Sequence, residues 1–300
     1  MKSTKISIIG TGNVGATTAY TLILKNLGSE IILVDRNEEK CDGEVRDLSD
    51  AIPFSEVSHV RQGTLKEAGQ AEIIIITAGV GKIEKGQTRL DLININKEIL
   101  KDIIEGMKPL NKNAIIIMVA NPVDILTCIA QEISGLPRKQ VMGSGTLLDT
   151  QRLRGYLSEK LDISEYSIHA YVLGEHGNSQ FVAWTHSNVA GIPLNKFCEI
   201  TGKCMKDIAE DTMKEAYKII EEKGATYYGI AACVSEICEN IIYDQKRVMP
   251  VSSYQEKFGI CFSMPTVLGC DGVKEVLDIE LSDDEKNALE KSAKQLKSVM

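Results

Sequence analysis

The sequence predicts an α/β protein whose first half folds into an open, doubly wound parallel sheet and whose second half forms an α+β domain. Two observations predict this arrangement. Short apolar runs alternate with amphipathic segments in the first half, and the alternation ends near residue 144. The chain has 300 residues, enough for about two domains, because single cores stop growing near ~250 residues. We therefore expect one domain over residues 1–143 and a second over residues 144–300.

The strands predicted for the first domain are short and rich in β-branched residues. Runs that are apolar at nearly every position are typical of parallel strands covered on both faces. Between them, apolar residues recur at helical spacing, so the pattern is a repeated strand-helix-strand unit with right-handed crossovers. The predicted strands are residues 6–9, 31–34, 73–76 and 115–119, and the predicted helices are residues 14–27 and 92–107.

The second domain begins with helical patterns and ends with strands. Long helices are predicted over residues 146–160 and 205–240, and alternating segments around 247–252 and 258–266 predict strands. The turn Gly269-Cys270-Asp271-Gly272 indicates a hairpin or bulged loop. The run Ser282-Asp283-Asp284-Glu285 is a capping box that opens a last helix reaching residue 299.

Composition excludes several classes of protein. Hydrophobic residues make up 43% and charged residues 25% of the chain, as in ordinary globular proteins. A net charge of −8 argues against nonspecific binding to nucleic acid or an anionic membrane, and no apolar stretch approaches the ~20 residues of a membrane span. The N-terminus lacks the pattern of a secretory signal, so we expect a cytoplasmic protein. The 8 cysteines show neither C-x-x-C pairs nor zinc-like spacing, which predicts reduced thiols and no metal site.

A glycine-rich loop follows the first predicted strand and opens the first helix, in the order Gly10-Thr11-Gly12-Asn13-Val14-Gly15. Gly10 would permit a tight turn, Gly12 the close approach of a pyrophosphate, and Gly15 close packing of helix on strand. The helix N-terminus adds N–H groups and partial positive charge for the phosphates. A merely tight turn is the alternative. The flanking strand and helix favour a dinucleotide site in a Rossmann domain.

Asp35 ends the second predicted strand, at the distance from the glycine loop expected for a ribose-binding acid. Its carboxylate would accept hydrogen bonds from the ribose hydroxyls and would repel a 2′-phosphate. NAD is therefore favoured over NADP, although the neighbouring Arg36 leaves NADP open.

Four later segments hold the residue types needed to reduce a 2-oxo acid, and the histidine is the first of them. His176 lies in Gly174-Glu175-His176-Gly177, after an apolar strand predicted over residues 168–173. Histidine gives and recovers a proton near neutral pH, so His176 is a candidate proton donor. The chain has 4 histidines, and spacing alone does not separate a catalytic histidine from a structural one.

Asp149 and Arg152 lie three residues apart, hence on one face of a predicted helix. They could form a surface ion pair of little energetic weight. Alternatively, Asp149 orients the imidazole and raises its pKa, while Arg152 binds a substrate carboxylate through two hydrogen bonds. The sequence leaves both interpretations open.

Asn121 and Arg89 complete the candidate set. Asn121 ends the strand at 115–119, at the sheet edge where ligands of open α/β sheets bind, or it forms a plain turn. Arg89 follows a polar, glycine-containing segment over residues 79–88, which we expect to be a mobile lid. Closure of such a lid would bring the guanidinium to the substrate carbonyl, which it would polarise.

Read together, these segments resemble the lactate/malate dehydrogenase superfamily over nearly the whole chain. The stretches that carry the resemblance are residues 10–15, Asp35, 77–79, 88–92, 121–124, 143–150, 174–177 and 223–229. The last three look more like L-lactate dehydrogenases than malate dehydrogenases. The resemblance implies an NAD-dependent L-lactate dehydrogenase that interconverts pyruvate and L-lactate, and that is a homodimer or homotetramer.

The same resemblance implies a role for each candidate residue. The acid-base residue would be His176, with Asp149 as its carboxylate partner and Arg152 as the carboxylate clamp. Arg89 would be the lid arginine, and Asn121 would hydrogen-bond near the nicotinamide. Cofactor contacts would include Ala78 and Gly79, and the substrate pocket would include Ile83, Thr226 and Ile230.

Two departures from the family leave the substrate open. Lactate dehydrogenases usually have aspartate where this chain has Asn178, and the run that follows looks more like L-2-hydroxyisocaproate dehydrogenases. The lid position that separates lactate from malate enzymes holds Ile83, or Lys82 or Glu84 if an insertion shifts the register. An L-2-hydroxyisocaproate-type enzyme, a malate dehydrogenase and a noncatalytic NAD-binding sensor are the alternatives.

The resemblance also implies a regulatory site. Arg154 and His169 match positions where allosteric bacterial lactate dehydrogenases bind fructose 1,6-bisphosphate between subunits. Two cations that face their symmetry mates would suit two phosphates. An exposed arginine and an ordinary strand histidine are the alternative, and both interpretations stay open.

Overall fold

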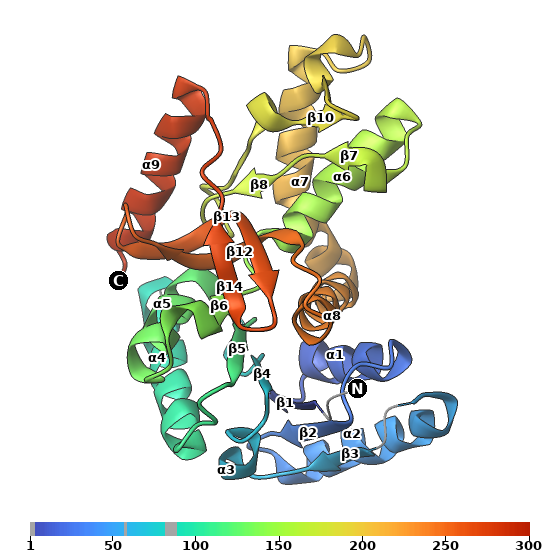
Figure 1. The fold of residues 1–300 in the computed structure, drawn as a ribbon, viewed down its shortest axis with the longest axis vertical. Helices are drawn as coiled ribbons and strands as arrows, with labels where there is room; N and C mark the ends of the chain where they lie inside the picture. Colours follow the sequence, from blue (N-terminus) through green and yellow to red (C-terminus); the bar gives the residue numbers. More distant parts are fainter. Residues whose placement is uncertain (1–3, 57–58, 82–88) are drawn as a thin grey trace.

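One sheet runs through both halves of the chain (Figure 1). The computed structural model describes residues 4–56, 59–81 and 89–300, and within them nine strands join in the order β14-β13-β12-β6-β5-β4-β1-β2-β3. The strands of the first half are parallel, and β1 pairs with β2 on one side and β4 on the other, which confirms a doubly wound sheet. These strands are β1 (Lys5–Ile9), β2 (Glu30–Val34), β3 (His59–Gln62), β4 (Ile73–Ile76), β5 (Ile115–Met118) and β6 (Val141–Gly143).

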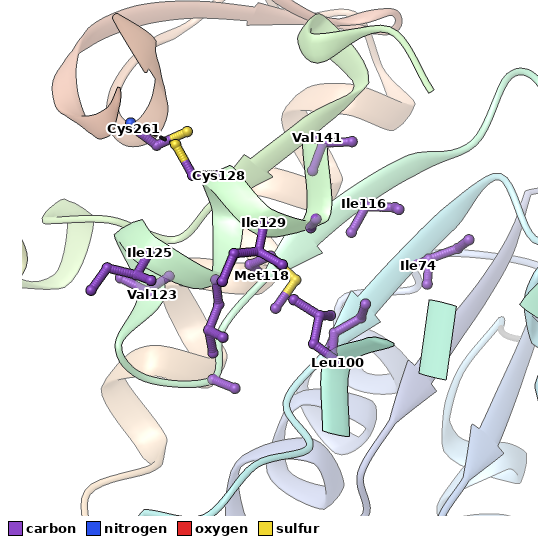
Figure 2. Packing of buried hydrophobic residues seen from close by; sticks show 14 of the residues in the cluster. Ile74, Leu100, Ile116, Met118, Val123, Ile125, Cys128, Ile129, Val141 and Cys261 are labelled. Carbon is purple, nitrogen blue, oxygen red and sulfur yellow. Dashed lines mark hydrogen bonds between the residues drawn. The ribbon is translucent and has the colours of Figure 1, made fainter. Parts of the chain in front are cut away.

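Helices cover both faces of this parallel sheet, because its strands are apolar on both faces. Along β4, Ile73 and Ile75 pack into one core cluster, and Ile74 and Ile76 pack into another on the opposite face. Figure 2 shows part of the second cluster, with Ile74 and Ile116 on neighbouring strands and Leu100 on a helix. The helices of the first half are α1 (Asn13–Leu24), α2 (Glu38–Ala51), α3 (Leu65–Ala68), α4 (Arg89–Met107) and α5 (Val123–Ile133).

The strands of the second half extend the same sheet instead of forming one of their own. β12 joins β6 in antiparallel fashion through Ser252 and Gly143, and β13 and β14 follow in antiparallel order. The remaining elements are α6 (Leu147–Leu161), β7 (Ile168–His169), β8 (Val172–Leu173), β9 (Phe181–Val182), β10 (Asn188–Val189), β11 (Ile192–Pro193), α7 (Gly202–Lys223), α8 (Tyr228–Ile242), β12 (Val248–Gln255), β13 (Ile260–Gly269), β14 (Gly272–Val276) and α9 (Asp283–Lys297).

Two elements predicted in the second half are divided in the structure. The helix expected over residues 205–240 is two helices, because Gly224 takes a left-handed conformation with φ of 86° and ends α7. The strand expected over 168–173 is split into β7 and β8, and the Ala170 carbonyl between them accepts a hydrogen bond from Arg154 Nε at 3.1 Å. The capping box at Ser282 and the helix that it opens are confirmed.

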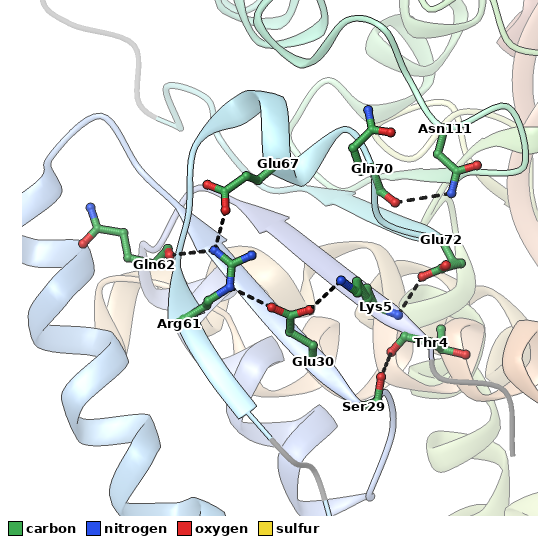
Figure 3. Close-up of polar contacts among 10 residues, drawn as sticks. All are labelled: Thr4, Lys5, Ser29, Glu30, Arg61, Gln62, Glu67, Gln70, Glu72 and Asn111. Atoms are coloured by element: carbon green, nitrogen blue, oxygen red, sulfur yellow. Dashed lines mark hydrogen bonds and ion pairs between the residues drawn. The ribbon is translucent and has the colours of Figure 1, made fainter.

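Charged side chains tie the strands together at the edge of the sheet where β1 and β2 begin (Figure 3). Glu30 accepts from Arg61 Nε at 2.7 Å and pairs with Lys5 Nζ at 3.1 Å. Arg61 also reaches Glu67 on α3 at 2.8 Å, and the Lys5 backbone N–H donates to Glu72 at 2.7 Å. These partly exposed pairs contribute little each. They do connect β1, β2, β3 and α3 at the edge opposite the glycine loop.

The part of the chain that the structure describes has no membrane span, no metal-binding cluster and no disulfide. No helix there is long and apolar enough to cross a membrane. The same residues contain no group of three histidine, cysteine, aspartate or glutamate side chains able to hold a metal ion. All eight cysteines are described and are free thiols, and five of them are buried.

Candidate active site

The glycine loop connects β1 to α1 and has room only for glycine at two positions. Gly10 has φ of +100°, and a Cβ there would lie 2.7 Å from the Ala78 nitrogen. A Cβ on Gly15 would lie 1.9 Å from the Gly10 carbonyl oxygen. Gly12 is the N-cap of α1 and has open space around its Cα, and no side chain in the described residues caps the helix. The first-turn N–H groups, which include those of Asn13 and Val14, can therefore bind a phosphate.

Asp35 lies at the end of β2, beside this loop. Its Oδ2 accepts from the Thr11 N–H at 2.6 Å and from the Thr11 hydroxyl at 3.2 Å, and its Oδ1 accepts from the Asn37 N–H at 2.9 Å. Burial opposes the charge, but the Asn37 and Thr11 donors hold the pKa of Asp35 below its ordinary value. The carboxylate therefore stays charged at neutral pH. Oδ1 has a single donor and keeps a lone pair for a ribose hydroxyl.

A buried asparagine that sequence reasoning missed holds the next part of the site. Asn96 on α4 is 2% exposed. Its Oδ1 accepts from the Val80 N–H at 2.7 Å, and its Nδ2 donates to the Val80 carbonyl at 3.0 Å and the Asn121 carbonyl at 2.8 Å. The loop after β4, with Ala78 and Gly79, is thereby tied to the end of β5. The only sign of this role in the sequence is a polar residue, an asparagine, on the buried face of an apolar helix.

Asn121 itself lies at the carboxyl end of β5, with an exposed side chain. Its Oδ1 accepts from the Val123 N–H at 3.3 Å. The glycine loop and Asp35 lie at the carboxyl ends of β1 and β2 in the same sheet. Because parallel strands end at one edge, these groups share the edge where ligands of open α/β sheets bind.

His176 and Asp149 are in direct contact. Asp149 lies in the first turn of α6, and His176 lies in the loop between β8 and β9. The His176 Nδ1 and the Asp149 Oδ2 are 2.7 Å apart. The Asp149 side chain is 4% exposed and that of His176 is 27% exposed, so the imidazole can meet a ligand while its partner is shielded.

This contact shifts both pKa values in the direction that favours an ion pair. Burial lowers the pKa of His176, but the Asp149 charge and hydrogen bond outweigh burial and raise the pKa to about 9. Burial works against the charge on Asp149 as well, but the His176 charge, the His176 hydrogen bond and the Arg152 charge together outweigh it, so the pKa of Asp149 lies below its ordinary value. The imidazole is therefore protonated at neutral pH. A protonated imidazole beside a carboxylate can act as a general acid.

Arg152 lies one helical turn after Asp149, with a side chain that is 11% exposed. Its Nη1 is 3.5 Å from Asp149 Oδ1. Within the described residues this is the one ion pair of Arg152, and it engages one of five guanidinium N–H donors. A guanidinium held in place beside a protonated imidazole forms a cationic site that suits a small carboxylate.

Asp124, in the first turn of α5, is a second residue that sequence reasoning did not single out. It is 2% exposed, and its Oδ2 accepts from the His176 backbone N–H at 2.7 Å. Burial raises the pKa of Asp124 to about 6, although the His176 N–H works in the opposite direction. The acid therefore fixes the backbone of the histidine loop to α5. Its only sequence signal is its place in the run at residues 121–124.

Replacing this acid tests its importance for the fold. Asp124→Ala is expected to lower the free energy of unfolding by about 1–3 kcal/mol, because the His176 N–H would lose a buried acceptor. Urea unfolding measures the change. The control is Asp102→Ala, at an exposed position on α4, which should change stability by about 0.5 kcal/mol or less. Equal stabilities of the two variants would contradict this role.

The predicted pocket residues lie beside the helix that carries Asp149 and Arg152. Thr226 lies between α7 and α8, and Ile230 lies in the first turn of α8. A Cβ on Gly229 would meet the Leu148 side chain at 2.9 Å, so α8 and α6 are in close contact there. Of the remaining candidates, Arg89 is the first residue of α4, and its side chain lies outside what the structure describes. Ile83, Lys82 and Glu84 also lie outside the described residues.

The two candidate regulatory residues lie near the Ala170 carbonyl. Arg154 donates to it from Nε, and its guanidinium carbon lies 5.3 Å from the centroid of the Tyr171 ring. Burial lowers the pKa of Arg154, and the charge of Arg247 lowers it further. His169 is an exposed residue of β7.

Comparison with known proteins assigns both halves of the chain to one family. Residues 4–143 match the family described as lactate/malate dehydrogenase, NAD binding domain. Residues 146–300 match the lactate/malate dehydrogenase, alpha/beta C-terminal domain.

Individual relatives match over nearly their whole length. L-lactate dehydrogenase A of Rhizopus oryzae is 47% identical, with 98% of this chain and 92% of that protein covered. L-lactate dehydrogenase 1 of Clostridium acetobutylicum is 43% identical, with coverage of 99% and 97%. The crystal structure of the minor L-lactate dehydrogenase from Enterococcus mundtii is 37% identical, covers 100% of this chain and 98% of that one, and has a TM-score of 0.96. With its glycine loop, its His176–Asp149 contact and these full-length matches, this chain belongs to the lactate/malate dehydrogenase family.

Proposed function

We propose that the protein is an NAD-dependent L-lactate dehydrogenase, which interconverts pyruvate and L-lactate. The observation that carries the proposal is the 2.7 Å contact between His176 and the buried Asp149, with Arg152 beside it. The relatives named above are L-lactate dehydrogenases. In this assignment residues 1–143 form the NAD-binding domain and residues 144–300 the catalytic domain.

His176 acts as the general acid in pyruvate reduction. The glycine loop and Asp35 would hold NADH, which would supply a hydride for the carbonyl carbon of the substrate. Because Nδ1 of His176 faces Asp149, Nε2 is the nitrogen that donates a proton to the carbonyl oxygen. Asp149 fixes this orientation and stabilises the charged imidazole. In lactate oxidation the neutral imidazole accepts the proton, so one residue serves both directions.

The other candidates bind and orient the substrate. Arg152 receives the carboxylate through two parallel hydrogen bonds, which fixes the position of the carbonyl carbon. Asn121 and Arg89 bind the carbonyl oxygen, and the role of Arg89 rests on the family resemblance. The family resemblance assigns Ile83, Thr226 and Ile230 to the pocket for the substrate methyl group. These roles combine the family resemblance with the positions of the described residues.

A substrate panel tests the assignment. The specificity constant kcat/KM should be highest for pyruvate and lower for 2-oxoisocaproate and oxaloacetate, with NADH as reductant. A preference for 2-oxoisocaproate would make the protein an L-2-hydroxyisocaproate-type enzyme, and a preference for oxaloacetate would make it a malate dehydrogenase. Tight NADH binding without turnover of any of the three would identify a noncatalytic sensor.

The pH dependence of the two directions should be opposite. Pyruvate reduction needs the protonated imidazole, so kcat/KM should be level below pH 9 and fall above it, because the pKa of His176 is about 9. Lactate oxidation needs the neutral imidazole and should rise with pH up to the same value. Asp149→Asn removes the main charge that raises this pKa, so the inflection should move from about 9 down toward 6.5, the ordinary histidine value. Profiles from pH 5 to 10 measure this, and an unmoved inflection would contradict the role of Asp149.

Regulation, assembly and location complete the proposal. Arg154 and His169 bind fructose 1,6-bisphosphate between subunits of a homodimer or homotetramer, and the positive charge of Arg247 near Arg154 supports a phosphate site. The bisphosphate should lower the KM for pyruvate. An unchanged KM at neutral and mildly acidic pH would contradict this regulatory role of Arg154 and His169.

The eight free thiols favour a reducing compartment, and we place the protein in the cytoplasm.

A further inference from the structure

The C-terminal helix α9 is hydrogen-bonded to the residue that precedes the catalytic histidine. Glu175 is 2% exposed. Its backbone N–H donates to the Ser292 hydroxyl at 2.7 Å, and its Oε2 accepts from Gln295 Nε2 at 3.0 Å. Ser292 and Gln295 lie one turn apart on α9. More than 110 residues of sequence therefore separate the two sides of this contact.

Two hydroxyl groups complete a closed ring. Ser179 Oγ lies 2.5 Å from Glu175 Oε2 and 3.1 Å from Ser292 Oγ. Each hydroxyl has one hydrogen, and the Glu175 carboxylate can only accept, so the Ser179 hydrogen is used for that contact. The directions then follow: Ser292 donates to Ser179, and Ser179 donates to the Glu175 carboxylate. This ring joins the first and last residues of the loop over residues 175–179, in which His176 is the second residue.

Gly174 just before this loop and Gly177 within it allow this close approach. A Cβ on Gly174, which has φ of +88°, would lie 2.8 Å from Ser292 Oγ. A Cβ on Gly177 would lie 3.3 Å from the carboxyl carbon of Glu175. Side chains at either position would press on α9 or on the Glu175 carboxylate. The glycines that flank His176 in the sequence thus serve the packing of α9 as well as access to the imidazole.

The beginning of α9 is fixed to the same part of the fold. Glu285 completes the capping box of the helix, and its Oε1 also accepts from the Thr185 N–H at 2.9 Å. Thr185 lies a few residues beyond β9, which follows the histidine loop. α9 is therefore held near the loop at its first turn and at its last turns. A helix fixed at both ends is a rigid support for the loop between β8 and β9.

We propose that Glu175 is a positioning residue for His176 and that α9 fixes the catalytic loop through Glu175, Ser179, Ser292 and Gln295. The inference rests on the proposed function, because it assigns these residues to the acid-base step. None of the four needs to touch the substrate. They determine where the His176 backbone lies, and therefore whether the imidazole keeps its 2.7 Å contact with Asp149 while it faces the substrate oxygen.

Variants on α9 test this at a distance from the substrate. Ser292→Ala and Gln295→Leu should each lower kcat for pyruvate reduction about tenfold, since small displacements of a catalytic group cost up to ~10²-fold. The KM for pyruvate and the dissociation constant of NADH should change less than threefold, by the same reasoning. Glu175→Ala should show a larger loss, and Glu175→Gln should restore part of it because its carbonyl oxygen still accepts from Ser179. Ser298→Ala, an exposed serine of the same helix end, is the matched control and should keep wild-type kcat.

The pKa of the His176 imidazole separates positioning from general stability. It is followed by NMR titration in each variant, with His176→Gln to assign the resonance. Displacement from Asp149 should lower this pKa in Ser292→Ala and leave it unchanged in Ser298→Ala. A lower melting temperature with wild-type kcat and an unchanged imidazole pKa would overturn the proposal. If the wild-type protein reduced no 2-oxo acid, the proposed function would fail, and the titration would still decide whether α9 positions His176.

Discussion

Replacing His176 with glutamine is expected to lower kcat for pyruvate reduction by about a thousandfold while NADH binds with unchanged affinity. General acid catalysis by a positioned side chain contributes ~10²–10⁴-fold, and His176 is the group that the structure holds protonated at neutral pH. Glutamine keeps an amide that can donate to Asp149. It has no proton to transfer, so only the acid-base contribution is removed.

The measurement combines steady-state kinetics at pH 7 with a fluorescence titration of NADH. His59→Gln is the matched control, because His59 is an exposed residue at the start of β3 and lies outside the site. That variant should keep the wild-type kcat. A His176→Gln enzyme within tenfold of the wild type would mean that another group supplies the proton, and the assignment of the site would be wrong.

The sequence predicted the first domain well because its signals are local. Four isoleucines in succession, Ile73–Ile76, are enough to indicate a strand buried on both faces, and the two core clusters confirm it. The glycine loop was also predictable, since the positions that need glycine lie within six consecutive residues. The end of α7 was not predicted, because it is decided by a single residue, Gly224, within a continuous helical pattern.

Long-range polar contacts could not be predicted in the same way. Asn96 and Asp124 each bind backbone groups of other segments, and the sequence gives no measure of which backbone lies opposite them. The pairing of β12 with β6 could not be predicted for the same reason. Alternation showed that residues 247–252 form a strand, but not that the strand would pair with Gly143.

The contact between His176 and Asp149 depends on such a long-range element. Ser263 on β13 accepts from the Thr146 N–H at 3.0 Å, at the beginning of the helix that carries Asp149. The Ser263 backbone also exchanges two hydrogen bonds of 3.0 Å with Gly174, two residues before His176. A strand near the end of the chain therefore brings the acid and the histidine together. Only the resemblance to a family, and no spacing rule, could pair them from sequence.

Arg152→Lys is expected to lower kcat/KM for pyruvate by about a hundredfold, mainly through a higher KM. Lysine keeps the charge but offers a single ammonium in place of a planar fork, so the two parallel hydrogen bonds to the carboxylate are lost. Losing part of a buried charged contact costs about 3 kcal/mol, which corresponds to about a hundredfold in affinity. Arg138→Lys, at a half-exposed position outside the site, is the matched control and should leave kcat/KM unchanged.

The variant also distinguishes two roles for Arg152. If Arg152 only supported Asp149, a lysine would make nearly the same contact as the guanidinium does at 3.5 Å. The main change would then be a shift in the pH profile of kcat/KM. If it binds the substrate carboxylate, the KM for pyruvate rises, the dissociation constant of NADH stays constant, and the inflection near pH 9 remains. Free guanidinium ions added to Arg152→Ala should then restore part of the lost activity, because they fit the space that the side chain leaves. Unchanged KM for pyruvate in Arg152→Lys would show that the carboxylate binds elsewhere in the site.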